Sequence, residues 1–279
     1  MPQCGDWTLA RLSLNQATTQ RWSLREAVAG CLRAGIPSIG LWRDKVAETG
    51  LVESAQLVRE SGLRVSSLCR GGMFPAATAR ERHARIEDNR HAIDEAAALG
   101  TNVLVLVCGA APDRDIDRAR AQIEEGIAAI LPHAVARGIR LGVEPLHPLY
   151  AAERSAIVTL GQALDLIDHL DSTQVGVVID VYHVWWDPNL YVQIARAAGR
   201  ILGFHLNDWL VPIVDPLLSR GMMGDGVIEI GRIARAVAAT GYGGPIEVEI
   251  FNQAIWDRPG DEVLAQIKER FTGLEGIGS

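Results

Sequence analysis

One pattern repeats along the chain: a helix-like run ends at a glycine, and a β-rich run follows directly. The glycines at these junctions are Gly35, Gly62, Gly100, Gly138, Gly199 and Gly241. Glycine suits this position because it readily adopts the left-handed backbone conformation that other residues resist after a helix. Regular alternation of helices and strands predicts an α/β fold with a parallel sheet.

The number of repeated units favours a closed barrel over an open sheet. Further strands are expected near 11–15 and 175–180, giving about eight strand-plus-helix units of roughly 30 residues each. A doubly wound sheet would normally carry a glycine-rich phosphate turn after its first strand, and none is present there. We therefore expect a single (β/α)8 TIM barrel domain over residues 1–279, closed by a helix at 260–271. Capping-box patterns at Ser23–Glu26 and Thr159–Gln162 mark two helix starts.

Composition and charge restrict the expected partners and compartment. The chain has 279 residues and a net charge of −7 without a basic cluster, which argues against nucleic acid as a partner. No terminal charged segment precedes a long apolar run, so neither a signal peptide nor a membrane span is expected. The cysteines lack CxxC spacing and are expected to be free thiols in a reducing cytoplasm. They are Cys4, Cys31, Cys69 and Cys108.

Four strand-like segments in the second half each carry one potential metal ligand near the downstream end. The segments are IRLGVEPLHP, VGVVIDVYH, ILGFHLND and GPIEVEIF, and the ligands are Glu144, Asp180, His205 and Glu249. Apolar residues such as Leu202 and Phe204 occupy the alternate positions, so each ligand should face away from the apolar side. Barrel enzymes place their chemistry at the C-terminal ends of the strands, where these four should meet.

This combination of side chains predicts a divalent metal site. Three carboxylates and an imidazole buried together would be costly as unpaired charges, and a cation resolves that cost. Carboxylate oxygens with one imidazole favour one Mn²⁺ ion, with Mg²⁺ or Co²⁺ as alternatives. Glu247 shares a face with Glu249 and competes with it as a ligand. We favour Glu249 because it lies nearer the strand end, which leaves Glu247 one layer deeper to pair inside the barrel.

At these residues the sequence resembles the xylose-isomerase-like TIM barrels, a superfamily of sugar isomerases and epimerases, inosose dehydratases and endonuclease-IV-type enzymes. The resemblance covers nearly the whole chain. It is carried by GVEP, by Asp-Val-Tyr-His at 180–183, by FHLND, by the segment 220–226 and by IEVEIF. It implies the same four metal ligands, a small-molecule sugar substrate, and substrate contact by His183 and Arg220.

The resemblance also implies a reaction, the isomerisation or epimerisation of a keto-sugar or sugar derivative through an enediolate. A divalent ion chelated by a carbonyl oxygen and the neighbouring hydroxyl acidifies the α-hydrogen. Keto-sugar epimerases of the family use metal-bound glutamates as bases, which implies catalytic roles for Glu144 and Glu249, with His183 the next candidate. Some of them carry another glutamate six residues after the first ligand, where this chain has Tyr150.

Additional side chains are expected to line the substrate pocket. His147 lies just past Glu144, and Trp185 and Trp209 follow strands on the predicted catalytic side. A flat indole ring there can cover the C–H face of a sugar or pack a loop or a subunit interface. Other aromatic residues in comparable positions are Trp42, Trp186 and Trp256.

Two arginines and one long segment complete the predicted site. Arg43 and Arg70 follow strands and could bind hydroxyl groups or a carboxylate. The segment 209–226 lies between a ligand-bearing strand and its helix and contains Arg220 with flexible glycines. We expect it to fold over the pocket as a lid, with Arg220 pointing inward.

Three other functions stay open. The nearest is a lyase or dehydratase on the same scaffold, of the inosose dehydratase or C-glycoside-cleaving kind, which shares the proton abstraction. An endonuclease-IV-like DNA repair enzyme would need histidines after the third and fourth strands, where this chain has Cys69-Arg70 and Cys108-Gly109. The third is a binding or regulatory barrel without chemistry. The sequence does not settle the sugar, its phosphorylation or whether the chain forms a homo-oligomer.

Overall fold

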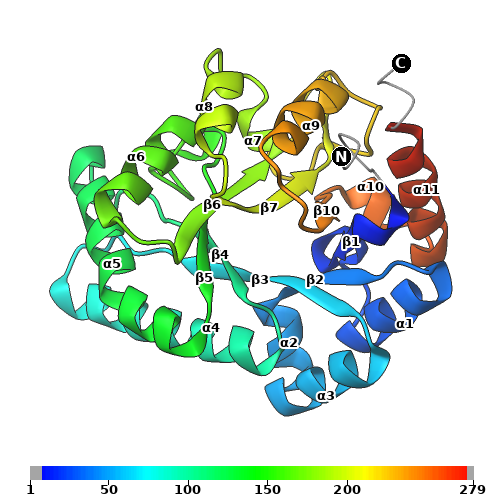
Figure 1. The fold of residues 1–279 in the computed structure, drawn as a ribbon, viewed down its shortest axis with the longest axis horizontal. Helices are drawn as coiled ribbons and strands as arrows, with labels where there is room; N and C mark the ends of the chain where they lie inside the picture. The colour runs from blue at the N-terminus through cyan, green and yellow to red at the C-terminus, as the bar shows by residue number, and fades with distance from the viewer. Residues whose placement is uncertain (1–7, 275–279) are drawn as a thin grey trace.

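Parallel strands form a closed barrel at the centre of the computed structural model, which describes residues 8–274 (Figure 1). In chain order they are β1 (Leu12–Asn15), β2 (Ser38–Trp42), β3 (Arg64–Gly72), β4 (Val103–Val107), β5 (Arg140–Val143), β6 (Val175–Asp180), β7 (Ile201–Leu206) and β10 (Ile246–Val248). They pair in the order β1-β10-β7-β6-β5-β4-β3-β2 and close back on β1. The structure confirms the predicted (β/α)8 barrel.

Helices surround this barrel and cover its outer face (Figure 1). The longer ones are α1 (Leu24–Ala34), α3 (Leu51–Ser61), α4 (Ala79–Ala98), α5 (Ile116–Arg137), α6 (Leu160–Leu170), α9 (Ile230–Ala239) and α11 (Gly260–Gly273). Shorter ones are α2 (Arg43–Thr49), α7 (Val181–Val184), α8 (Leu190–Arg196) and α10 (Gln253–Trp256), with 3-10 turns η1 (Leu9–Arg11), η2 (Gln16–Thr19) and η3 (Pro148–Tyr150). Among the described helices, none is long and apolar enough to cross a membrane.

The predicted helix boundaries have the expected local causes. All six junction glycines have positive φ values, between 66° and 85°. Ser23 and Glu26 form a complete capping box at the start of α1. At the start of α6, Thr159 caps the helix, but Gln162 accepts from the N–H of Val158 and so completes no box.

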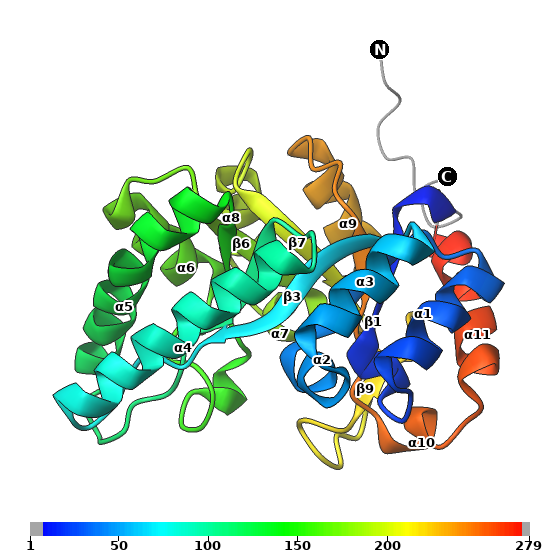
Figure 2. The ribbon, with the colours of Figure 1, turned by 90° about the horizontal axis from the view of Figure 1, so that it is seen from below.

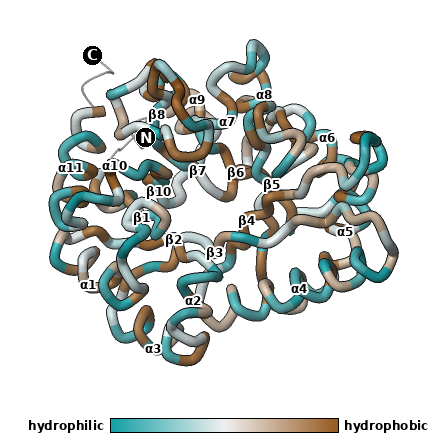
Figure 3. The backbone as a smooth tube through the Cα atoms, turned by 180° about the vertical axis from the view of Figure 1, so that it is seen from behind, coloured by the Kyte–Doolittle hydropathy of each residue, from teal (hydrophilic) through white to brown (hydrophobic). Residues whose placement is uncertain are grey.

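Apolar side chains on the outer faces of the strands pack against the helices and form the main core. In Figure 3, β4 is coloured hydrophobic, whereas α4 outside it is largely hydrophilic. The prediction that Leu202 faces the helices was wrong. Leu202 packs against Gly176 near the N-terminal ends of the strands, while Ile201 joins the outer core. The cause is a register shift between β6 and β7, which interrupts the alternation of faces before Phe204.

Two features at the C-terminal ends of the strands position the site. A two-stranded antiparallel sheet, β8 (Asp208–Trp209) with β9 (Arg220–Gly221), closes the base of the long segment after β7. Figure 2 shows β9 beside α10 at one end of the barrel. Inside the barrel, Cys69, Val105 and Val178 form a small apolar cluster beneath Trp42.

Cys31, Cys69 and Cys108 are free thiols, as expected, and Cys4 lies outside the described residues.

Candidate active site

The structure brings together the four residues predicted as metal ligands. Glu144 directly follows β5, Asp180 ends β6, His205 lies in β7 and Glu249 directly follows β10. Backbone hydrogen bonds continue the barrel ladder to both glutamates, from Glu144 N to Leu106 O at 3.1 Å and from Glu249 N to Leu206 O at 3.0 Å. One possible ligand atom from each of the four lies within 4.8 Å of the others, and all four residues are buried.

His205 and Glu144 carry polar atoms that the protein itself leaves without hydrogen bonds. His205 Nδ1 lies 3.4 Å from Glu144 Oε1 and 3.8 Å from Glu249 Oε2. Neither ring nitrogen of His205, nor Oε1 of Glu144, has a hydrogen-bond partner within the described residues. Buried polar atoms without partners are costly, and a cation between the carboxylates and the imidazole would satisfy them. The residues therefore fit a divalent metal ion.

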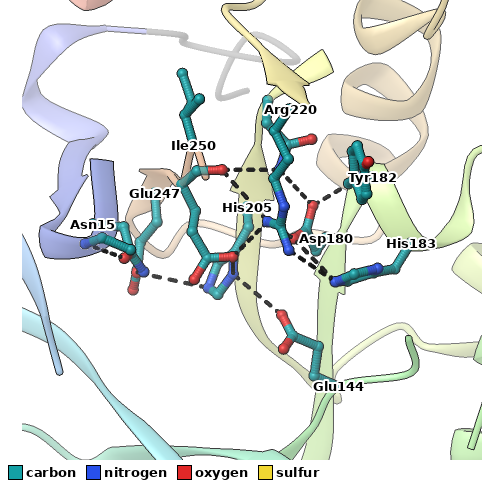
Figure 4. Close-up of polar contacts among 12 residues, drawn as sticks. Asn15, Glu144, Asp180, Tyr182, His183, His205, Arg220, Glu247 and Ile250 are labelled. Carbon is teal, nitrogen blue, oxygen red and sulfur yellow. Dashed lines mark hydrogen bonds and ion pairs between the residues drawn. The ribbon is translucent and has the colours of Figure 1, made fainter. Parts of the chain in front are cut away.

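Glu247 lies one layer deeper in the barrel and is not part of the cluster. Its carboxylate accepts hydrogen bonds from Asn15 Nδ2 at 2.9 Å and Ser67 Oγ at 2.7 Å, and Oε2 lies 3.7 Å from His205 Nε2 (Figure 4). Gly40 makes room for it, because a Cβ at that position would collide with the carboxylate. Glu247 faces the ring nitrogen that points away from Glu144, and such a contact orients a histidine.

Arg220 enters the cluster from the long segment after β7. Its guanidinium is buried between the rings of Tyr182 and Phe251, each 4.8 Å from Cζ. Nη1 donates to Asp180 Oδ2 and to Glu249 Oε2, both at 2.8 Å, and Nη2 lies 3.1 Å from His183 Nε2 (Figure 4). Arg220 thus points inward as predicted, and it neutralises two of the carboxylates.

The two glutamates have opposite electrostatic environments. Burial raises the pKa of Glu144 to about 7, and the nearby charge of Glu249 adds to this effect against the opposing influence of His205. Burial also disfavours ionisation of Glu249, but His205 and Arg220 outweigh it and lower its pKa to about 2. Glu144 is therefore the stronger proton acceptor of the two in this arrangement.

His183 lines the pocket beside Arg220 and is buried. Its Nδ1 accepts a hydrogen bond from the backbone N–H of His147 at 3.1 Å. Burial lowers the pKa of His183 to about 3, so the ring stays neutral around pH 7. A neutral ring fixed at Nδ1 by the His147 N–H offers a polar surface next to the metal cluster.

A pocket opens above the cluster. Its inner end is formed by Glu144, Glu249, His183 and Arg220. Trp42 and Phe251, which meet edge to face with ring centroids 5.5 Å apart, and the aliphatic Leu146 and Leu217 form its walls. Tyr150, Arg70 and Arg154 also line it.

The other predicted pocket residues lie elsewhere. His147, Trp185 and Trp209 are absent from the pocket lining and pack together outside it. The Trp209 ring lies 4.8 Å from that of His147 and 5.6 Å from that of Trp185. Arg43 is held by Asp88 and Glu95 in the next groove outward. Trp186 and Trp256 donate their indole N–H groups to backbone carbonyls.

The segment 209–226 folds over the pocket, and its contacts explain how it is held. The carbonyl oxygen of Pro216 accepts hydrogen bonds from the hydroxyl groups of Tyr150 and Tyr182, the latter at 2.7 Å. Leu217 then forms part of the pocket wall. Tyr150, which replaces a glutamate of some epimerases, therefore ties down the lid.

Sequence reasoning missed Asn207 and Asp208, which support the site from behind. Asn207 Nδ2 donates to Asp180 Oδ1 at 2.8 Å and to the carbonyl of Glu249 at 3.1 Å. The Asp208 carboxylate accepts from four backbone N–H groups, of Trp209, Gly224, Gly226 and Ile228, and so fixes the base of the lid. Their position directly after a ligand-bearing strand was the available signal.

Comparison with known proteins places these features in a family. The crystal structure of protein SMc04130 from Sinorhizobium meliloti 1021 superposes with a TM-score of 0.94 at 52% identity, covering 96% of this chain and 99% of that one. The IolI protein, solved with a zinc atom, gives a TM-score of 0.83 at 18% identity, covering 95% and 97%. D-Allulose 3-epimerase from Methylomonas sp. gives 0.76 at 20% identity, covering 95% and 97%. At this low identity, the last two show a shared fold.

Sequence similarity to curated proteins is more distant. A 3-dehydroshikimate dehydratase from Pseudomonas aeruginosa is 28% identical over 194 residues, which cover 64% of this chain. The match spans only 28% of the length of that relative. A family model described as "Xylose isomerase-like TIM barrel" matches residues 28–271. With its closed barrel and its buried Glu-Asp-His-Glu cluster, the chain belongs to the xylose isomerase-like TIM barrel family.

Proposed function

We propose that the protein is a divalent-metal-dependent enzyme that removes the proton beside the carbonyl group of a keto-sugar or related polyhydroxy ketone and returns it to isomerise or epimerise the substrate. The observation that carries this proposal is the buried cluster of Glu144, Asp180, His205 and Glu249, with its unpartnered polar atoms, at the inner end of a pocket. The named relatives include an epimerase that shares the fold and a dehydratase that is similar in sequence.

The four cluster residues would hold the ion through three carboxylates and one imidazole. We favour Mn²⁺ because oxygen donors dominate the set. When bound, the ion supplies Lewis acidity that polarises the substrate carbonyl and stabilises the enediolate charge.

Glu144 is the proposed base. Its Oε1 has no hydrogen-bond partner among the described residues, its side chain lines the pocket, and its raised pKa suits proton acceptance. The carboxylate takes the α-proton, and the C–H electron pair forms the new C=C bond while the carbonyl oxygen gains charge. Return of the proton to the former carbonyl carbon, with transfer of the neighbouring hydroxyl proton to the former carbonyl oxygen, gives an isomer. Return of a proton to the opposite face of the original α-carbon gives an epimer. That step needs a second acid, and Glu249 could serve only after taking up a proton from solvent, because its lowered pKa keeps it ionised around pH 7.

Arg220 and His183 would orient the substrate. The Arg220 guanidinium holds Asp180 and Glu249 in place, and His183 presents a neutral ring beside it. Trp42 and Phe251 offer apolar surfaces for the C–H face of a sugar ring.

Dehydration is a second candidate. The curated relatives are dehydratases, and Tyr150 stands where some epimerases of the family carry a glutamate. The proton abstraction is the same, but the electron pair then expels a hydroxyl group from the β-carbon. Glu144 can return its proton to that leaving hydroxyl, which departs as water. Because Glu249 is held by Arg220, a mechanism with one base is compatible with the observed asymmetry of the two glutamates.

The test is a screen of keto-sugars and cyclic 3-oxo compounds, including 3-dehydroshikimate, with the Mn²⁺-loaded protein in D₂O. NMR should show loss of the α-proton signal in a metal-dependent manner, together with a new epimer, isomer or dehydrated product. Absence of both exchange and product across the screen, with metal binding confirmed separately, would reject the proposal.

A further inference from the structure

Two arginines at the outer end of the pocket have no anionic partner in the part of the chain that the structure describes. Arg70 lies near the end of β3, and Arg154 lies in the segment between β5 and α6. Both line the same cavity as Glu144 and Glu249. Within residues 8–274, neither side chain forms an ion pair or donates a hydrogen bond.

The neighbouring arginines differ in this respect. Arg220 is neutralised by Asp180 and Glu249. Arg43 is held by Asp88 and Glu95, and Arg85 donates to the carbonyl oxygens of Met73 and Pro75. Among the described arginines that line the pocket, Arg70 and Arg154 therefore lack a partner, whereas Arg220 has two.

Their surroundings make the unpaired charges unfavourable. Arg154 is half-buried over the ring of Tyr150, with Cζ 5.8 Å from the centroid. Its pKa is lowered first by burial and then by the like charge of Arg70. Arg70 interacts electrostatically with Asp88 but makes no direct contact with it. Arg43 already binds that carboxylate at 2.9 Å. Two like charges that share a partly desolvated cavity are stabilised by an anion between them.

We propose that the substrate carries an anionic oxygen group, a carboxylate or a phosphate, that binds Arg70 and Arg154 while its ketone lies at the Glu144 end of the pocket. This inference rests on the proposed function. Guanidinium groups match both anions because their N–H donors form paired, charge-assisted hydrogen bonds. A neutral sugar would leave the two cations unpaired, so the arginine pair would select anionic substrates over neutral ones.

Three ligands with one carbon framework test the inference: D-fructose, D-fructuronate and D-fructose 6-phosphate. They share the reacting ketone and differ only in the terminal group, which is neutral, a carboxylate or a phosphate. Binding to the Mn²⁺-loaded protein is measured by calorimetry, and α-proton exchange in D₂O is measured by NMR. We expect an anionic member to bind at least about tenfold more tightly than fructose, as loss of a charge-assisted pair would predict. Whichever anionic member binds more tightly identifies the group.

Arg70→Gln and Arg154→Gln should each remove most of this preference and leave fructose binding nearly unchanged. Arg59→Gln on α3 is the matched control, because it removes one exposed positive charge from a helix outside the pocket lining. Equal binding of all three ligands, or retention of the preference in both pocket variants, would overturn the inference. Selective binding without proton exchange would support the anion site and reject the proposed chemistry for these ligands.

Discussion

The hydroxyl group of Tyr150 donates a hydrogen bond to the carbonyl oxygen of Pro216 and so joins the segment after β5 to the lid over the pocket. Tyr182 donates to the same oxygen from α7. The two phenols hold the lid closed over Glu144, and this arrangement occupies the position where some epimerases of the family carry a glutamate.

Tyr150→Phe should loosen the lid without changing metal binding. Loss of one hydrogen bond is worth about 1 kcal/mol, or roughly fivefold in the closing equilibrium. Hydrogen exchange of the backbone amides at 213–218 should rise by about that factor, and KM should rise with it. Tyr182→Phe serves as the comparison, and the double variant should exceed either single one. Unchanged exchange in the double variant would show that other contacts hold the lid.

Metal binding should depend on the cluster and, less strongly, on the layer beneath it. Asp180→Asn removes a charged ligand but keeps its shape, so metal affinity should be lost with little change in circular dichroism. Glu247→Gln weakens only the support of His205 and should reduce Mn²⁺ affinity by about 10- to 100-fold.

Asp187→Asn is the matched control for these measurements, since Asp187 also follows β6 but caps a turn at Asn189 outside the cluster. It should bind Mn²⁺ like the unmodified protein when followed by calorimetry or electron paramagnetic resonance. Equal losses in the Asp180 and Asp187 variants would contradict the proposed metal centre.

The two glutamates should contribute unequally to proton removal. Glu144→Gln should slow α-proton exchange by about 100-fold or more, the usual contribution of a general base. Glu249→Gln should slow it less, because Arg220 and His205 keep that carboxylate a weak proton acceptor. Both variants are compared by NMR in D₂O at saturating Mn²⁺. Should Glu144→Gln exchange at the original rate, His183 becomes the next base to test.

His183 should make the metal-free protein less stable as the pH falls. Burial lowers its pKa to about 3, so below its unfolded pKa of about 6.5 the unfolded state takes up a proton that the folded state does not. The free energy of unfolding should decrease as pH falls below that value, by up to about 1.4 kcal/mol per pH unit.

Urea unfolding of the protein and of His183→Gln, both in EDTA, isolates this contribution as a difference. The raised pKa of Glu144 acts with opposite sign between its unfolded value and about 7, and the lowered pKa of Glu249 acts only in more acidic solution. Both effects are largely shared by the two proteins. The stability difference should therefore shift in favour of the variant as pH falls from about 7 to about 5, and parallel curves would rule the assignment out.

The barrel and the four cluster residues were predictable because both are encoded locally. A glycine after a helix sets a left-handed turn, and alternation along a strand fixes which face Glu144, Asp180 and Glu249 share. Strand ends then converge because a parallel barrel gathers them at one rim. The choice of Glu249 over Glu247 followed from the same geometry, since one step of two residues along a strand is one layer of the barrel.

Other features depend on contacts between distant segments and could not be predicted in this way. Asn15 supports Glu247 only after β1 pairs with β10. Leu202 turned inward because a register shift, invisible in the sequence, interrupts β7. His147 and Trp209 lie in segments outside the barrel strands, where backbone conformation decides the direction of a side chain, and they pack against each other outside the pocket.

The cluster residues come from β5, β6, β7 and β10, which are consecutive in the barrel, whereas Trp42, Arg70 and Val107 come from the opposite half, β2 to β4. Each half has its own strands and helices, and the ladder between β4 and β5 joins the two halves. We therefore expect substitutions at the ends of β2 to β4 to change which substrates bind, with little effect on the metal cluster. A library confined to these positions and to Arg154 is the natural starting point for engineering this barrel toward new substrates.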